Sequence, residues 1–257
     1  MKKLNSIFLA LAVVVISGIA HADQELYPVE IEADLNGDGV TESILFKPFN
    51  SEGGVGFCEY LLVINGIESS HHAVFLTGLI EVVDIDSSDP FKEITISEYG
   101  PSDDPASYFF RFKKGNLFEL GCIPGSLGHG PNGLVVDGTG IVTANCRGNI
   151  LHTWWHPCRY QIGQYGAFEV IPATNYIMNA KLEMLQTLSL LNSPGSSDFA
   201  VELSPGESIT VISTDDVQWC QVKTENGEMG WFEMTNSETL ADGRNVQEVF
   251  EGLCIAD

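Results

Sequence analysis

Short apolar runs separated by Gly, Asn, Pro or Asp recur along most of the chain. The clearest runs are rich in β-branched and aromatic residues, which favour strands. They are Leu61–Ile64, Glu93–Ser97, Ser107–Phe112, Gly140–Thr143 and Ile209–Ile212. Between such runs, Asn65-Gly66 and Lys114-Gly115-Asn116 have the composition of hairpin turns. The pattern predicts an all-β protein.

Helical periodicity is scarce. The segment Asn245–Leu253 places apolar side chains on one helical face, and Asp242 or Asn245 is a suitable N-cap. A weaker helical pattern covers Asn179–Leu188. We therefore expect a short terminal helix in an otherwise β fold.

Three Asp-rich or Gly-rich segments, each followed by a strand-like run, form a weak repeat. They are Asp34–Glu42, Asp84–Glu93 and Asp137–Gly140, and their first aspartates are 50 and 53 residues apart. A period of this length indicates stacked or radial β units. Three units are fewer than the four or more blades of a closed propeller. We expect a propeller-like or sandwich-like β domain, not a full ring.

The start of the chain has the pattern of a secretory signal peptide. Met1-Lys2-Lys3 precedes an apolar run from Ile7 to Ala20, and Ala20-His21-Ala22 is an A-x-A cleavage signal. The run is too short to span a membrane, which takes about 20 residues. We predict an exported protein, periplasmic or extracellular, with no transmembrane segment after cleavage.

The cysteine count is even, which in an exported chain indicates disulfides. The six are Cys58, Cys122, Cys146, Cys158, Cys220 and Cys254. Only Cys220 and Cys254 lie in the C-terminal region, so one interpretation pairs them, and leaves the other four to pair in one of three ways. A zinc site is the rival interpretation, but the chain has no C-x-x-C.

The composition describes a folded acidic protein. Asp and Glu number 35 against 12 Lys and Arg, the net charge is −23, and 44% of residues are hydrophobic. The acidic residues are scattered among strand-like runs, unlike those of a disordered tail. Such a surface repels phosphates, so we expect no nucleic-acid partner, and it tolerates divalent cations.

The first repeat segment has the pattern of a calcium loop. Side-chain oxygens alternate along it, and Gly39 permits the sharp turn that aims a backbone carbonyl inward. The predicted ligands are Asp34, Asn36, Asp38, the carbonyl of Val40, and Glu42. Extracellular calcium sites bind in the range of about 0.1–1 mM, so the expected role is weak and structural. The alternative is a metal-free turn.

This pattern resembles the calcium loops of FG-GAP and VCBS repeat proteins. It is not an EF-hand, because Leu45 occupies the twelfth loop position, where a bidentate Glu is needed. Pro90 and Lys92 disrupt the ligand spacing of the second copy, and we expect a metal-free turn there.

Other chemistry is sparse. Asp84, Asp86, Asp103 and Asp104 are the only carboxylate cluster that we can nominate for hydrolysis. The segment Leu151–Cys158 contains two histidines, His152 and His156. In a strand they would lie about 13 Å apart, which is too far to share a metal ion, so we interpret the segment as an aromatic strand with one buried face. The chain has no G-x-S-x-G, H-E-x-x-H or P-loop motif, and we expect no catalytic activity.

The region from about Ala180 to Thr235 resembles the bacterial Src-homology-3-like (SH3-like) domain over about 55 residues. The motifs are L-x-x-G-x-x-x-x-V within Val201–Ile212, W-x-x-V from Trp219, and G-x-x-G-W ending at Trp231. The resemblance implies a small β barrel that binds cell-wall peptides or mediates contacts. Trp219 and Trp231 are the candidate ligand-binding residues, since their rings can stack on an extended ligand.

The mature chain as a whole resembles uncharacterised secreted bacterial proteins that combine a D-L-N-G-D-G unit, a G-P-S-D-D loop, the barrel and a final segment seen here as Val249–Asp257. This resemblance implies an architecture and no activity.

The predicted domains are a signal peptide (1–22), an FG-GAP/VCBS-like β domain (23–178) and an SH3-like barrel with a helical tail (179–257). The predicted function is that of a non-catalytic exported binding protein, with a calcium-braced β domain and a barrel that contacts cell wall, peptide or a protein partner. The alternative is a cell-wall or glycan hydrolase that uses the barrel for targeting.

Overall fold

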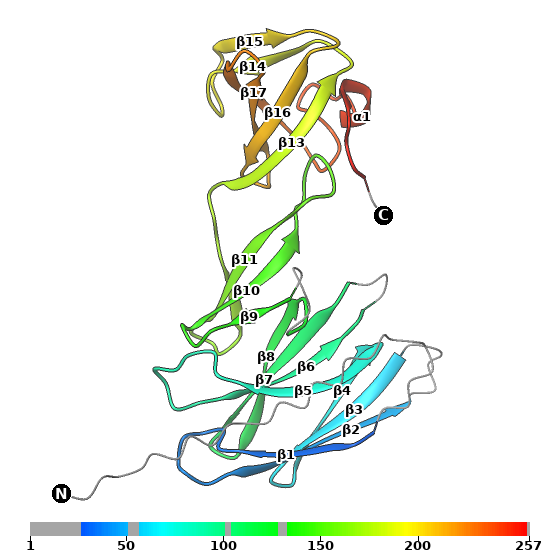
Figure 1. The fold of residues 1–257 in the computed structure, drawn as a ribbon. Coiled ribbons are helices and arrows are strands. Elements are labelled where there is room, and N and C mark those ends of the chain that lie inside the picture. The colour runs from blue at the N-terminus through cyan, green and yellow to red at the C-terminus, as the bar shows by residue number, and fades with distance from the viewer. Residues whose placement is uncertain (1–26, 51–56, 101–103, 128–132, 256–257) are drawn as a thin grey trace, which may run out of the picture.

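The computed structural model describes residues 27–50, 57–100, 104–127 and 133–255 (Figure 1). The predicted signal peptide, Met1–Ala22, lies outside these residues, as does Asp103. The regular structure is almost entirely strand, arranged in four antiparallel sheets, which confirms the all-β prediction. Across the described ranges, no helix has the length and apolar character needed to cross a bilayer.

The first two sheets are meanders, in which each strand pairs with the next. The first contains β1 (Val29–Ala33), β2 (Glu42–Asn50), β3 (Phe57–Ile64) and β4 (Ile67–Val74). The second contains β5 (Leu76–Val83), β6 (Glu93–Glu98), β7 (Ala106–Lys113) and β8 (Asn116–Pro124). Asn65 and Gly66 both adopt positive φ, as do Lys114 and Gly115, so both predicted hairpin turns are confirmed.

The third sheet is a meander of shorter strands. It contains β9 (Val135–Val136), β10 (Ile141–Arg147), β11 (Trp155–Ile162) and β12 (Phe168–Ile171). The structure begins β11 at Trp155, so the predicted aromatic strand is shorter than expected, and His152 belongs to the preceding loop.

The second sheet lies between the other two. Ile94, Ile96 and Phe110 pack in the core that it shares with the first sheet. Phe109 and Leu120 pack in the core that it shares with the third. Every residue of β6 is buried as a result. The N-terminal part is therefore a sandwich-like stack of three sheets, and none of them closes into a ring in the described ranges.

The fourth sheet is C-terminal and has the order β15-β14-β18-β17-β16-β13-β19. The strands are β13 (Tyr176–Met184), β14 (Leu188–Leu191), β15 (Phe199–Leu203), β16 (Ser208–Thr214), β17 (Trp219–Thr224), β18 (Met229–Glu233) and β19 (Phe250–Glu251). Its edge strands β15 and β19 do not pair with each other, so the structure corrects the expected small closed barrel to an open sheet over the residues it describes. The sheet begins at Tyr176, three residues before the predicted boundary.

The helical expectations are met only in part. The helix α1 (Val246–Val249) is capped by Asn245, whose side chain accepts the Gln247 amide at 2.9 Å. It is shorter than predicted because Phe250 adopts extended backbone and pairs with β13. The helix expected over Asn179–Leu188 is wrong. Alternate residues of β13 face the core there, with a period of two.

The loop 148–154 joins the third sheet to the fourth. It extends from the β10–β11 hairpin and places Ile150 and Leu151 in the apolar core of the fourth sheet. The Leu151 amide donates to the Ser237 carbonyl at 2.9 Å, and the Thr153 amide donates to the Cys254 carbonyl at 2.7 Å. The two parts of the molecule therefore share apolar packing and backbone hydrogen bonds.

The repeat segments correspond to one feature of the fold: each connects the first two strands of one N-terminal sheet. We call residues 34–41, 84–92 and 137–140 the turn stack. The Lys92 amide donates to the Leu35 carbonyl at 3.0 Å, and the Gly140 amide donates to the Ile85 carbonyl at 2.7 Å. Each of the three segments thus belongs to a different sheet, and neighbouring turns are joined by backbone hydrogen bonds.

Replacement of Gly37 tests the contact between the first two turns. Gly37 has φ of 74°, and a Cβ added there would lie 2.7 Å from Pro90 Cβ and 2.7 Å from its carbonyl oxygen. Gly39 has a similar φ of 85° with nothing within 4 Å, which makes it a matched control. We expect Gly39→Ala to lower the free energy of unfolding by about 1 kcal/mol and Gly37→Ala by about 3 kcal/mol. Equal losses in denaturant titrations would contradict packing between the turns.

Candidate functional site

Three of the predicted calcium ligands, Asp34, Asn36 and Asp38, accept hydrogen bonds from backbone amides of the first turn. Asp34 Oδ1 accepts the Gly37 amide at 2.7 Å, and its Oδ2 accepts the Gly39 amide at 2.9 Å. Asn36 Oδ1 accepts the Asp38 amide at 2.9 Å, and Asp38 Oδ1 accepts the Val40 amide at 2.8 Å. The side-chain oxygens that are predicted to bind calcium therefore already stabilise the turn by accepting hydrogen bonds from its backbone amides.

Glu42 has a second role that the sequence interpretation missed. It is buried at the start of β2, where its Oε2 accepts the Leu35 amide and its Oε1 accepts the Asn36 side-chain amide, both at 2.8 Å. Glu93 repeats this arrangement at the start of β6: its Oε2 accepts the Ile85 amide at 3.1 Å. In two of the turns, a Glu at the first position of the second strand thus accepts a hydrogen bond from a backbone amide of the turn. The presence of Glu at the end of both the Asp34–Glu42 and the Asp84–Glu93 segments was the sequence signal for this role.

Calcium remains a prediction for this site. Within the described ranges, no three His, Cys, Asp or Glu side chains converge on a position that could hold a metal ion. Val40, the predicted carbonyl ligand, is exposed. One further observation concerns the second turn, where Asp84 Oδ1 is buried without a hydrogen-bond partner in the described structure.

The turn stack lowers the pKa of one aspartate in each turn. Partial desolvation raises the pKa of Asp34, but the hydrogen bonds from the Gly39 and Gly37 amides outweigh it. The Ser88 hydroxyl and amide lower the pKa of Asp86, and the Thr139 hydroxyl and amide lower that of Asp137. The stack therefore favours ionised carboxylates at three neighbouring positions.

The carboxylates nominated for hydrolysis do not converge. Asp84 and Asp86 precede β6 and Asp104 follows it, and a six-residue strand is roughly 20 Å long. Asp103 lies outside the described residues. The length of β6 thus separates Asp104 from Asp84 and Asp86.

Trp219 and Trp231 lie on one face of the fourth sheet. Trp219 pairs with Glu233, and Trp231 pairs with Gln221, so the two rings are diagonal neighbours, roughly 7–8 Å apart at the backbone. The alternate residues of these strands, such as Cys220 and Val222, are fully buried on the other face. Both tryptophans are only partly buried, and neither belongs to the apolar core.

The face extends across the neighbouring strands. Trp231 pairs with Leu191, which in turn pairs with Phe199, and the Phe199 side chain is 69% exposed. We call Leu191, Phe199, Trp219 and Trp231 the aromatic face. Gly230 permits this arrangement, because a Cβ there would lie 2.5 Å from Leu190 Cβ on β14. The G-W motif therefore reflects close approach of two strands beside an outward tryptophan.

The turn before β17 is organised by the carboxylate of Asp215, which also bonds the amide of Trp219. Asp215 Oδ1 accepts the backbone amides of Val217, Gln218 and Trp219 at 3.0, 2.8 and 2.8 Å. The next residue, Asp216, has φ of 61° and turns its side chain away toward the third sheet.

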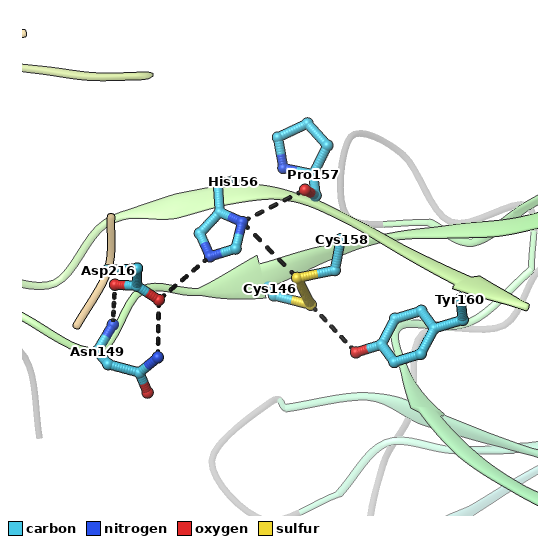
Figure 2. Close-up of a disulfide and its surroundings, with 7 residues drawn as sticks. All are labelled: Cys146, Asn149, His156, Pro157, Cys158, Tyr160 and Asp216. Atoms are coloured by element: carbon cyan, nitrogen blue, oxygen red, sulfur yellow. Dashed lines mark hydrogen bonds and ion pairs between the residues drawn. A yellow bond between two sulfur atoms is a disulfide. The ribbon is translucent and has the colours of Figure 1, made fainter. Parts of the chain in front are cut away.

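One disulfide is present among the described residues. Cys146 and Cys158 are bonded, with 5.8 Å between their Cα atoms (Figure 2). The other four cysteines are free thiols, so the expected Cys220–Cys254 bridge is not formed. Cys220 points into the core of the fourth sheet, where burial raises its pKa to about 12, whereas Cys254 is exposed beside the loop 148–154.

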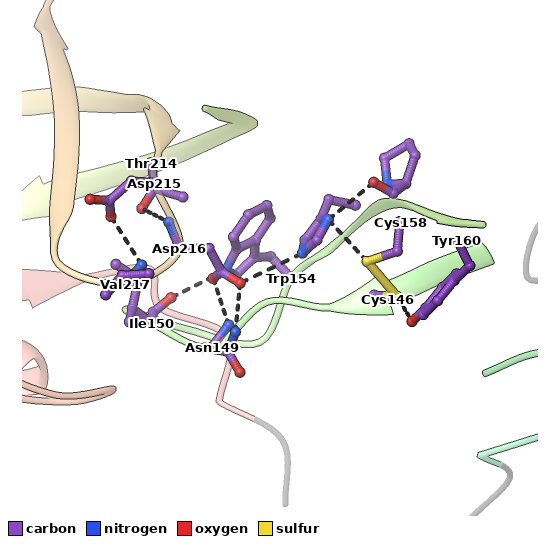
Figure 3. A network of polar contacts seen from close by, with 12 residues as sticks. Cys146, Asn149, Ile150, Trp154, Cys158, Tyr160, Thr214, Asp215, Asp216 and Val217 are labelled. Atoms are coloured by element: carbon purple, nitrogen blue, oxygen red, sulfur yellow. Dashed lines mark hydrogen bonds and ion pairs between the residues drawn. A yellow bond between two sulfur atoms is a disulfide. The ribbon is translucent and has the colours of Figure 1, made fainter. Parts of the chain in front are cut away.

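A buried polar network connects this disulfide to the fourth sheet (Figure 3). His156 Nε2 lies 3.6 Å from Asp216 Oδ2, and both residues are buried. Asn149 holds Asp216 with its backbone amide at 2.6 Å and its side-chain amide at 2.7 Å. The sequence interpretation missed this network, because its members are far apart in the chain.

His152 lies in the loop before β11 and not in one strand with His156, so the separation of about 13 Å expected within a strand does not apply to this pair. His152 lines a pocket of about 330 Å³ beside the loop 148–154, and neither of its ring nitrogens has a hydrogen-bond partner among the described residues. Burial lowers the pKa of His152.

Comparisons of the chain with family models, with curated proteins and with solved structures find no match.

The carboxylates of the turn stack give a prediction for acid titration. Folding lowers the pKa values of these aspartates below 3.8, the pKa of an Asp in the unfolded chain. Their contribution to the free energy of unfolding is therefore fully present at a pH above 3.8, and it is lost as the pH falls through their pKa values in the folded protein. In carboxyl-carbon NMR titrations with chelator present, we expect Asp34, Asp86 and Asp137 to titrate below 3.8.

Ser88→Ala is the matched control. It should move the midpoint of Asp86 upward and leave that of Asp137 in place, since each hydroxyl bonds only its own aspartate. Midpoints at or above 3.8 in all three residues would contradict the hydrogen-bonded geometry.

Proposed function

We propose that this protein is an exported, non-catalytic binding protein whose aromatic face receives an extended peptide, with cell-wall peptides as the class that the SH3-like resemblance implies. The proposal rests on one observation above all: Trp219 and Trp231 lie side by side on the outer face of β17 and β18 and outside the core. Two adjacent rings on a rigid sheet offer stacking surface at little entropic cost.

Charge supports a ligand that bears amino groups. The chain carries a net charge of −23, and Glu233 is paired directly with Trp219. A cationic group near the ring face gains both cation–π attraction and ion pairing. A strongly anionic ligand would be repelled by the same surface.

The N-terminal sheets serve in this proposal as a rigid support braced by the turn stack, with weak calcium binding at Asp34, Asn36, Asp38, Val40 and Glu42. Export to the periplasm or the exterior is consistent with the disulfide Cys146–Cys158. Millimolar calcium would be available to a weak site there.

A pelleting experiment with purified cell-wall sacculi tests the binding proposal. We expect the protein to sediment with sacculi and Trp231→Ala to bind about tenfold more weakly, because truncation of a central aromatic contact typically costs 1–2 kcal/mol or more. Trp155→Ala is the matched control, since Trp155 is 49% exposed on the third sheet and should bind normally. Equal binding by wild type and Trp231→Ala, or no sedimentation of wild type, would refute the proposal.

Thermal unfolding in the presence of calcium tests the proposed calcium site at Asp34–Glu42. With a dissociation constant near 0.5 mM, 5 mM calcium should raise the melting temperature by about 3 °C. Asp38→Ala should abolish the shift, and Asp86→Ala, in the turn expected to be metal-free, should retain it. An unchanged melting temperature in wild type would exclude the calcium site.

A further inference from the structure

We propose that Cys146–Cys158 is a thiol–disulfide exchange site that reacts with a dithiol, with His156 as the proton donor to the departing Cys158 sulfur. This activity is separate from ligand binding at the aromatic face. It rests on the groups that surround the two sulfur atoms and on the strands that carry them.

The bond links strands that are already held together. Strands β10 and β11 pair at seven positions from Ile141–Gln161 to Arg147–Trp155. Within this register Cys146 faces His156 and Ala144 faces Cys158, so the bond joins diagonal neighbours. The hairpin keeps its backbone hydrogen bonds when the bond opens, so both cysteines stay in place for the return reaction.

Each sulfur has its own polar neighbour. His156 Nδ1 lies 3.7 Å from Cys158 Sγ, and the Tyr160 hydroxyl lies 3.4 Å from Cys146 Sγ (Figure 2). An imidazolium is the stronger acid of the two groups and stabilises a departing thiolate better than a phenol does. The environment therefore favours departure of Cys158 and attack at Cys146.

Asp216 holds His156 for this role. Its carboxylate faces Nε2 at 3.6 Å, and the Pro157 carbonyl lies 3.3 Å from Nδ1 (Figure 2). Both ring nitrogens thus face acceptors, an arrangement that a ring with two N–H groups satisfies. Asn149 fixes the carboxylate through two hydrogen bonds, so the histidine is oriented by residues of both parts of the molecule.

The sulfurs are within reach of a reductant. Cys146 and Cys158 are both partly exposed. Cys146 also packs against the core of the third sheet, so this residue has one apolar side and one side open to solvent, and exchange requires the open side.

The exchange proceeds in two steps. A thiolate of the dithiol attacks Cys146 Sγ and forms a mixed disulfide, while the Cys146–Cys158 bond breaks and its electron pair stays on Cys158 Sγ, which takes a proton from His156. The second thiolate of the reductant then attacks its own sulfur in the mixed disulfide and releases Cys146 Sγ, which is protonated from solvent. His156 regains its proton from solvent, so two electrons and two protons pass to the protein in all, and the reductant, which gave up two protons as its thiolates formed, leaves as a disulfide.

Reduction kinetics with dithiothreitol test the role of His156. We expect His156→Gln to slow reduction of Cys146–Cys158 about tenfold, because the departing sulfur loses its proton donor. Tyr160→Phe is the matched control and should change the rate by less than about twofold. A wild-type rate in His156→Gln, with circular dichroism and melting temperature unchanged, would overturn the proposal.

A second measurement uses only the wild-type protein and does not depend on whether a variant folds. The oxidised protein is mixed with a monothiol, quenched with an alkylating reagent and mapped by peptide mass spectrometry. We expect the mixed disulfide on Cys146 and the alkyl group on Cys158. An adduct on Cys158, equal adducts on both sulfurs, or no adduct would overturn the proposal.

Discussion

The second sheet is covered on both faces, and the arrangement of the N-terminal part depends on this constraint. A strand with one solvated face alternates apolar and polar residues, but every residue of β6 is buried. Its apolar residues Ile94 and Ile96 face one core, and the polar residues between them face the other side. Burial of apolar area at two interfaces supplies the driving force that holds three meanders in one stack.

The same burial requires that the polar groups at the sheet edges be satisfied. Glu93 is fully buried and accepts both the Ile85 amide and the Arg111 side chain, with the Arg111 Nε bond at 2.7 Å. Burial of an unpaired Glu93 carboxylate would cost much free energy, so the hydrogen bond from the second turn and the ion pair with Arg111 are both needed for this sheet to be buried. Glu42 does the same for the first turn with uncharged donors. A buried Glu at the start of the second strand thus ties the first two turns to their sheets.

The connection between the two parts of the molecule determines where reactive groups meet. The loop 148–154 inserts two apolar residues in the C-terminal core, and this contact brings Asp216 to His156. The turn at Asp215 and Asp216 leads into β17, which carries Trp219 of the aromatic face. The Asp215 carboxylate accepts the Trp219 amide. The Asp216 carboxylate faces His156, which lies beside the disulfide. Stability of this turn is therefore linked to both proposed activities.

The sequence by itself determined the fold class, the strands at Leu61–Ile64, Glu93–Ser97, Ser107–Phe112 and Ile209–Ile212, both hairpin turns, an N-cap at Asp242 or Asn245, and the motifs that contain Trp219 and Trp231. These features depend on local periodicity, on turn chemistry and on motif spacing, which act between near neighbours in the chain. The tertiary structure alone decided that three sheets stack without closing, that β13 is a strand, that Cys146 bonds Cys158, and that Asp216 meets His156. Those outcomes depend on which surfaces cover one another across tens of residues, and burial of that kind leaves no periodic signal in the sequence.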